Sequence, residues 1–161
     1  MKANMDATLN IQKMMQAGKF EAAMEIAKAM TAEGQDPRDI DGDRDRDTHT
    51  QSLQYVEGLY LQAVCSRFLK DYDLATELLA TLRRVAPDFG RGLQEEGHLA
   101  RDQGNFDAAL AVYRRATRAN PGLIAAWVSK AIILQKQGNM REASQAKYQA
   151  DRLKNLPSAL M

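Results

Sequence analysis

A six-residue segment recurs along the chain at an interval of 34 residues. It reads K-D-Y-D-L-A at 70–75, G-N-F-D-A-A at 104–109 and G-N-M-R-E-A at 138–143. A period of this length, made of helix-forming residues, predicts an array of helix–turn–helix units in which each unit buries its apolar face only against its neighbours. We therefore expect an all-α protein, a right-handed superhelical solenoid of about four units and eight helices.

The recurring segment has the chemistry of a tight turn between two helices. Gly104 and Gly138 suit the left-handed residue that closes a helix, because glycine has no Cβ to clash there. Asp71, Asn105 and Asn139 follow at matched positions, and each offers a side-chain oxygen that can cap the next helix.

Small residues and prolines recur at the same interval. We expect the small residues to lie where the two helices of a unit approach most closely, and the prolines, which lack an amide hydrogen, to end a unit. The small positions are Ala63, Gly97 and Ala131 in the first helices and Ala75, Ala109 and Ala143 in the second, and the prolines are Pro87 and Pro121.

These residues resemble the tetratricopeptide repeat, whose pattern runs W-x₂-L-G-x₂-Y, A-x₃-F and P. The segment 90–123 matches best, and Trp127 occupies the bulky first position of the next unit. The chain departs from the pattern where Gln62, Glu96 and Lys130 replace its leucine and where Lys147 replaces its phenylalanine.

The resemblance divides the chain into four units within one domain, 1–161. The units cover about 4–36, 56–89, 90–123 and 124–157, and a charged, Asp-rich loop of about 36–50 separates the first two. The expected helices are about 4–17, 19–33, 51–69, 72–85, 89–103, 106–119, 123–137 and 140–154.

The charge balance and the short apolar runs of the chain argue against two classes of partner, nucleic acids and membranes. The 22 basic and 21 acidic residues leave a net charge of +1, which argues against a nucleic-acid partner. The apolar runs are far shorter than the ~20 residues that span a bilayer, and the N-terminus lacks an apolar secretory signal. We expect a cytoplasmic, bacterial protein with no membrane partner.

The sequence offers no set of residues typical of catalysis or of a bound cofactor. Cys65 is the single cysteine, and neither of the two histidines, His49 and His98, is placed in the sequence to suggest that it activates the thiol. No phosphate-binding G-x-x-x-x-G-K-[ST] motif occurs. We therefore expect no catalytic residue, no cofactor and no metal site in this chain.

The partner-binding surface is predicted on the first helices of the units, which line the concave side of such an array. An apolar and charged strip there suits a protein or peptide, because charges fix the register and apolar side chains supply anchoring. The expected groove residues are Tyr60, Val64, Phe68, Arg91, Gln94, Glu95, His98, Arg101, Val128 and Ile132. Tyr60 and Phe68 are the expected apolar anchors.

Two segments also resemble a subgroup of repeat arrays, those that precede the catalytic domain of bacterial sulfotransferase-family proteins. They are A-P-D-F-G-R-G-L-Q-E-E-G-H at 86–98 and L-K-N-L-P-S-A-L at 153–160, and the likeness covers about 87–161. It implies an alternative function, in which this chain recruits a substrate or partner for a sulfotransferase domain outside it. A third hypothesis is self-association through the C-terminal edge.

The Asp-rich segment generates a first prediction. Its carboxylates alternate with arginines, and neither register places glycine at the sixth and glutamate at the twelfth position of an EF-hand loop. Starting from Asp39 these positions hold Arg44 and Thr50, and starting from Asp43 they hold Thr48 and Gln54. Calorimetric titration with calcium should show no binding tighter than about millimolar. A saturable micromolar isotherm that is lost in Asp43→Ala would contradict this interpretation.

Overall fold

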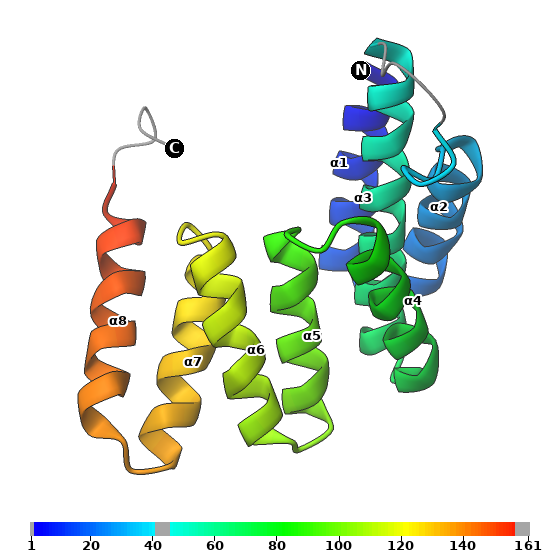
Figure 1. The fold of residues 1–161 in the computed structure, drawn as a ribbon. Helices are drawn as coiled ribbons and strands as arrows, with labels where there is room; N and C mark the ends of the chain where they lie inside the picture. The colour runs from blue at the N-terminus through cyan, green and yellow to red at the C-terminus, as the bar shows by residue number, and fades with distance from the viewer. Residues whose placement is uncertain (1, 41–45, 157–161) are drawn as a thin grey trace. The chain divides into compact units, whose positions relative to one another are not determined.

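The computed structural model describes residues 2–40 and 46–156 of the chain. Within these ranges the chain forms eight α-helices and no strand (Figure 1), which confirms the predicted all-α class. None of these helices is long and apolar enough to cross a membrane. The helices are α1 (Lys2–Gln16), α2 (Phe20–Glu33), α3 (Arg46–Phe68), α4 (Tyr72–Val85), α5 (Gly90–Asp102), α6 (Phe106–Ala119), α7 (Ile124–Lys136) and α8 (Met140–Lys154).

The turns between paired helices have the chemistry that the sequence predicts. Gly104 and Gly138 have φ angles of 79° and 78°, in the left-handed region. Asn105 accepts a hydrogen bond from the Ala108 amide, and Asn139 and Asp71 cap α8 and α4 in the same way. The repeated segment therefore acts as a helix-closing and helix-capping turn.

Helix α3 begins earlier than predicted. The repeat pattern placed its start at residue 51, but the helix begins at Arg46, so residues 46–50 are helical rather than part of the loop. No glycine or proline stands between Arg46 and Gly58 to stop the helix. A hydrogen bond from the Gln35 amide to the Gln51 carbonyl, 3.2 Å long, also fixes this part of α3 against the end of α2.

The described start of the Asp-rich segment is a hydrogen-bonded turn. The Asp36 carboxylate accepts bonds from the Arg38 amide and guanidinium, and these bonds hold its pKa below the usual value. Asp41, Asp43 and Asp45 lie outside the described residues. Across the described ranges no three His, Cys, Asp or Glu side chains are grouped as metal ligands, and the calcium prediction remains to be tested.

The helices form two compact units, each larger than a single repeat. From here on, unit 1 means Met1–Pro87 and unit 2 means Asp88–Met161. Unit 1 contains α1 to α4 and unit 2 contains α5 to α8, and in each unit consecutive helices pack against each other. Each unit has its own buried apolar cluster. The expectation of one continuous domain with a right-handed superhelix stays a prediction.

In unit 1, close packing of α2 on α3 depends on a glycine. A Cβ on Gly58 would lie 2.5 Å from the Thr31 hydroxyl and 2.9 Å from the Thr31 amide nitrogen. The Gln62 side chain, which replaces the leucine of the repeat pattern, donates a hydrogen bond of 2.6 Å to the same hydroxyl. A polar contact therefore takes the place of the apolar one between these two helices.

In unit 2, Tyr113 of α6 is the largest fully buried side chain. A Cβ on Gly97 would stand 2.5 Å from its ring, so α5 can approach α6 only with glycine at this position. The Tyr113 hydroxyl lies 2.6 Å from Nδ1 of His98 and hydrogen-bonds to Ser129 of α7. Tyr113 thus joins three helices through one buried ring and its hydroxyl.

The small residues of the second helices are buried as predicted. Ala75 and Ala109 are completely inaccessible to solvent, and Ala143 is 6% exposed. Ala109 belongs to the apolar cluster of unit 2, beside Leu93 and Tyr113. These contacts confirm that the 34-residue period marks the line along which paired helices touch.

Ala109→Leu should therefore destabilise the protein by about 1–3 kcal/mol, because the added atoms must displace close-packed neighbours. Ala111→Leu is the matched control, since Ala111 is exposed on the same helix. Chemical denaturation followed by circular dichroism measures both free energies of unfolding. Equal stabilities of the two variants would contradict the packing assignment.

Tyr113 gives a prediction about alkaline pH. Burial raises its pKa above the ordinary value of 10.0, so the folded protein holds this proton more tightly than the unfolded chain does. The stabilisation is fully present below pH 10 and is lost as the pH rises through the higher folded-state pKa. Tyr113→Phe should remove this part of the alkaline loss of stability.

The same substitution should cost about 1 kcal/mol at neutral pH, because it removes the hydroxyl that bonds to His98 and Ser129. Tyr148→Phe serves as the control, since Tyr148 is 64% exposed. The measurement is the free energy of unfolding from pH 7 to pH 11. Parallel curves for the wild type and Tyr113→Phe would show that Tyr113 does not titrate differently on folding.

Candidate protein-binding surface

The groove residues predicted in unit 1 lie on α3 and differ in exposure. Tyr60 is half-buried and packs against the apolar cluster of the unit, and Val64 is 5% exposed. Phe68 is 48% exposed, and its ring stacks on Phe20 of α2 with centroids 4.6 Å apart. Among the predicted anchors of this unit, Phe68 therefore presents the larger surface.

The groove residues predicted on α5 are mostly half-buried. The Arg91 guanidinium lies 5.0 Å from the centre of the Phe89 ring, and Arg101 forms an ion pair with Asp102 at 2.8 Å. Gln94 is half-buried, whereas Glu95 is only 2% exposed and is not an accessible carboxylate in this structure. The side chains of Arg91, Gln94 and Arg101 are each half-buried, so part of each reaches the solvent.

His98 has a structural partner. Its ring meets the Tyr113 ring edge-on with centroids 5.5 Å apart, in addition to the short contact between Nδ1 and the hydroxyl. The imidazole is half-buried. The structure accounts for His98 by its place between α5 and α6, a role that sequence spacing did not indicate.

The groove residues predicted on α7 are Val128, which is half-buried, and Ile132, which is 49% exposed. Helices α5 and α7, the first helices of consecutive repeats, contact each other within unit 2. We call the predicted groove residues of unit 2 that are exposed or half-buried, Arg91, Gln94, Arg101, Val128 and Ile132, the first-helix face; that they form one binding surface stays a prediction. A groove that continues through both units stays a prediction.

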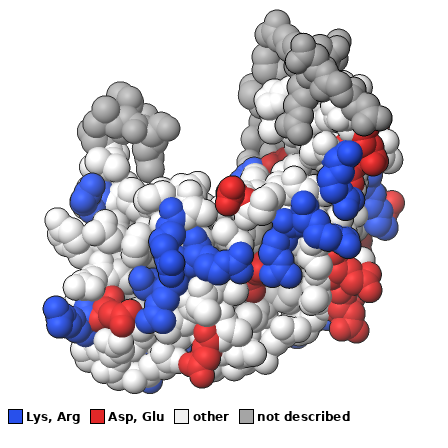
Figure 2. Space-filling view, viewed as in Figure 1, with Lys and Arg blue, Asp and Glu red and all other residues white. Residues whose placement is uncertain are grey.

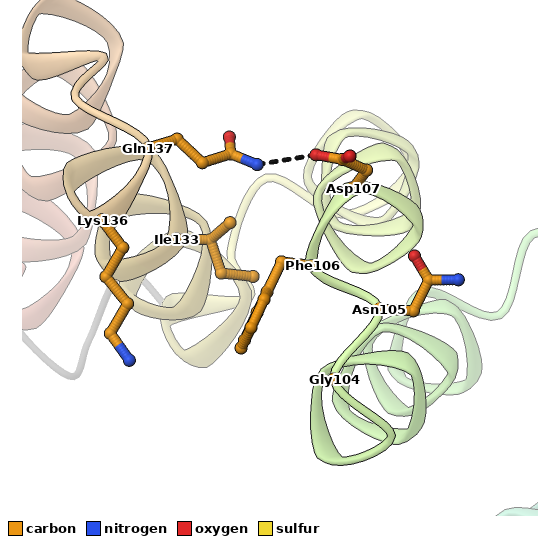
Figure 3. A pocket seen from close by; sticks show the side chains of 7 residues that line it. All are labelled: Gly104, Asn105, Phe106, Asp107, Ile133, Lys136 and Gln137. Carbon is orange, nitrogen blue, oxygen red and sulfur yellow. Dashed lines mark hydrogen bonds between the residues drawn. The ribbon is translucent and has the colours of Figure 1, made fainter.

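An open pocket that the sequence analysis did not anticipate lies at the turn between α5 and α6 (Figure 3). It has a volume of about 450 Å³, and Lys136 and Gln137 at the end of α7 face Phe106 and Asp107 at the start of α6. Gln137 donates a hydrogen bond of 2.7 Å to the Asp107 carboxylate. Lys136 stands 5.8 Å from the centre of the Phe106 ring.

The repeat pattern contained a signal for this pocket. Phe106 and Phe20 hold matched positions at the start of a second helix, and Lys136 and Phe68 hold matched positions at the end of the next first helix. In unit 1 this pair is the aromatic stack of Phe20 on Phe68, whereas in unit 2 it is Phe106 beside a lysine. The lysine does not stack on the ring as an aromatic side chain does, and Phe106 is 43% exposed.

A second group of charged residues lies on α6, α7 and α8. Arg114 and Glu142 form an ion pair of 2.9 Å, and the bond from Arg114 lowers the pKa of the Glu142 carboxyl. Lys130 is half-buried nearby, and its pKa is lowered first by burial and then by the charge of Arg114. Lys130, like Gln62 in unit 1, stands where the repeat pattern has a leucine.

The outward positions of the described part of α8 are mainly polar. The exposed residues include Ser144, Gln145, Lys147, Asp151 and Arg152, together with Tyr148. Met140 and Tyr148 of α8 are also exposed, and self-association through this edge stays a prediction.

Comparisons with known proteins agree with the fold. A tetratricopeptide-repeat family model matches residues 100–146, and no curated protein matches the chain significantly. TTC0263, a thermophilic TPR protein of Thermus thermophilus, is 18% identical with a TM-score of 0.67, over 96% of this chain and 76% of that one.

Two further solved structures are similar. The type III secretion translocator chaperone SycD of Yersinia enterocolitica is 18% identical with a TM-score of 0.61, over 74% of this chain and 89% of that one. A crystal structure of MamA is 15% identical with a TM-score of 0.58, over 89% of this chain and 94% of that one.

At these identities the structures establish the fold alone, and the resemblance to sulfotransferase-associated arrays stays a prediction. Residues 100–146 carry a tetratricopeptide repeat, and the chain has the fold of tetratricopeptide-repeat proteins.

Proposed function

We propose that this chain is a non-catalytic scaffold that binds a partner protein or peptide on the first-helix face of unit 2. The observation that supports this most is Ile132, an isoleucine 49% exposed on a helix whose next residue, Ile133, is 1% exposed. An exposed apolar side chain on a folded face gives a partner an anchoring contact.

The polar neighbours of Ile132 on this face support the same function. Arg91, Gln94 and Arg101 on α5 are only half-buried, so hydrogen bonds and charge can fix the orientation of a bound segment. Helices α5 and α7 also belong to consecutive repeats that contact each other. Such a surface fits an extended or helical segment longer than a single side chain.

The similar structures favour protein binding in general terms. SycD is a type III secretion translocator chaperone. The fold likeness does not carry that partner over to this chain, so we propose the class of ligand and not its identity. Recruitment of a substrate for a catalytic domain encoded elsewhere in the same reading frame would use the same face.

The test is Ile132→Glu, with Met140→Glu as the matched control. Both side chains are exposed and apolar, 49% and 57%, but Met140 begins α8 and lies outside the first-helix face. Partners captured by the tagged wild type are identified and then titrated against each purified variant. We expect Ile132→Glu to weaken binding by about tenfold or more and Met140→Glu to leave it unchanged.

Circular dichroism and thermal unfolding serve as folding controls for both variants. If Ile132→Glu folds and binds the same partners with unchanged affinity, the first-helix face is not the binding site. Equal losses in the two variants would indicate a surface other than the one proposed.

A further inference from the structure

A group of cations lies on α6 and α7 of unit 2, and none of its residues belongs to the first-helix face. It consists of Arg114 and Arg118, one turn apart on α6, and Lys130 on α7, with Trp127 beside the lysine. We call these four residues the basic patch. Figure 2 shows Lys and Arg side chains gathered over this part of unit 2.

The cations of the basic patch interact electrostatically with one another. The charges of Arg114 and Arg118 both lower the pKa of Lys130, whereas the charge of Glu142 on α8 raises it. Glu142 pairs with Arg114 at 2.9 Å. Arg114 and Lys130 therefore both act on this carboxylate, and Arg118 adds a third positive charge that acts on Lys130. The surplus positive charge favours an anionic ligand.

The position of Lys130 is unfavourable for a charged residue. It replaces the leucine of the repeat pattern and is half-buried, and burial is the main cause of its lowered pKa. At the matched position in unit 1, the Gln62 amide donates a hydrogen bond to the Thr31 hydroxyl. Thr31 and the equivalent Thr117 each donate their own hydroxyl to the carbonyl four residues earlier in the same helix. In unit 1 the polar residue therefore bonds to a side chain of the neighbouring helix. Lys130 instead lies 5.0 Å from the Trp127 ring and keeps a half-buried charge beside two arginines, and an anionic ligand would stabilise that charge.

Trp127 gives the basic patch an aromatic contact surface. Its indole N–H donates a hydrogen bond of 2.8 Å to the Pro121 carbonyl, which fixes the ring, and the Lys130 ammonium lies 5.0 Å from the ring. The side chain is half-buried and not enclosed. Tryptophan and arginine are the residue types most enriched at the centres of protein interfaces.

The charge of the chain is also divided between its units. Residues 88–161 contain eleven Lys and Arg against seven Asp and Glu, a net charge of +4, whereas residues 1–87 contain eleven against fourteen, a net charge of −3. The near-neutral total therefore conceals a basic second unit. Long-range attraction would bring an acidic ligand to this unit.

We propose that the basic patch is a second docking surface and that it binds an Asp- and Glu-rich segment of a partner polypeptide. Arg114 already holds a carboxylate in a charge-assisted hydrogen bond, so its geometry suits this group. Nucleic acids are usually bound through a longer row of phosphate contacts than three cations on two helices provide. Carboxylates supply the charge and a polypeptide supplies side chains for Trp127.

The test uses an acetylated octaglutamate peptide as the probe. Trp127 is the single tryptophan of the chain, so its fluorescence reports directly on the basic patch. We expect a saturable change in emission at low ionic strength, with an affinity that falls as salt is added. Anisotropy of a fluorescein-labelled octaglutamate gives a second readout that does not depend on Trp127.

Two double variants separate the basic patch from charge in general. Arg114→Gln with Arg118→Gln should weaken octaglutamate binding by about tenfold. Arg83→Gln with Arg84→Gln removes the same charge from exposed positions on α4 of unit 1 and should leave binding unchanged. Equal weakening by both pairs, or none by the first, would overturn the proposal.

The variant Lys130→Leu separates a loss of binding from a loss of folding. It restores the leucine of the repeat pattern and removes a half-buried charge, so it should raise the melting temperature while it weakens octaglutamate binding by about threefold or more. A stabilised variant that binds octaglutamate like the wild type would show that Lys130 takes no part. Ile132→Glu should leave octaglutamate binding intact, which keeps this test independent of the first-helix face.

Two other outcomes would also overturn the proposal by naming a different occupant. One is tighter binding of an eight-nucleotide oligothymidylate than of octaglutamate, which would point to nucleic acid. The other is self-association at low salt that Arg114→Gln with Arg118→Gln abolishes, which would assign the basic patch to the acidic unit of a second copy. Sedimentation velocity of the wild type and the variant measures the latter.

Discussion

The packing of unit 2 depends on the close approach of α5 and α6 at Gly97 and Tyr113. Glycine leaves room for the ring, and the ring in turn places its hydroxyl between His98 and Ser129 of two neighbouring helices. A larger residue at 97 would separate the helices and expose the buried cluster. Unit 1 solves the same problem with Gly58 against Thr31. These buried contacts keep the helices of each repeat packed, so the residues on the outward faces of the helices can differ from repeat to repeat.

Because buried contacts stabilise the fold and outward-facing residues do not, one fold can carry the two kinds of surface that we propose. The first-helix face of unit 2 combines an exposed isoleucine with partly exposed arginine and glutamine, which suits an amphipathic ligand. The basic patch places three cations and a tryptophan on other helix positions, at the cost of a half-buried charge. Both proposed surfaces lie on helices of unit 2, so the effect of a substitution at either surface can be attributed to binding when folding is shown to be intact.

The sequence predicted the fold more fully than the sites, for a physical reason. Turn glycines, cap residues and small contact residues obey local steric rules, and Gly104, Asn105 and Ala109 each occupy the predicted role. Exposure depends on neighbours far along the chain, so the burial of Glu95 and the contact of His98 with Tyr113 could not be read from spacing. The pocket at Phe106 depends on Lys136 replacing an aromatic residue, a difference that is visible only when matched positions are compared.

The most direct test of the central claim is methyl NMR of the chain during titration with a captured partner. Ile132 and Ile133 are adjacent in sequence but 49% and 1% exposed, so they form an internal comparison within α7. Docking on the first-helix face predicts large shifts of the Ile132 and Val128 methyl signals and small shifts for Ile133. Unchanged Ile132 and Val128 signals at saturation, with shifts elsewhere, would contradict the account.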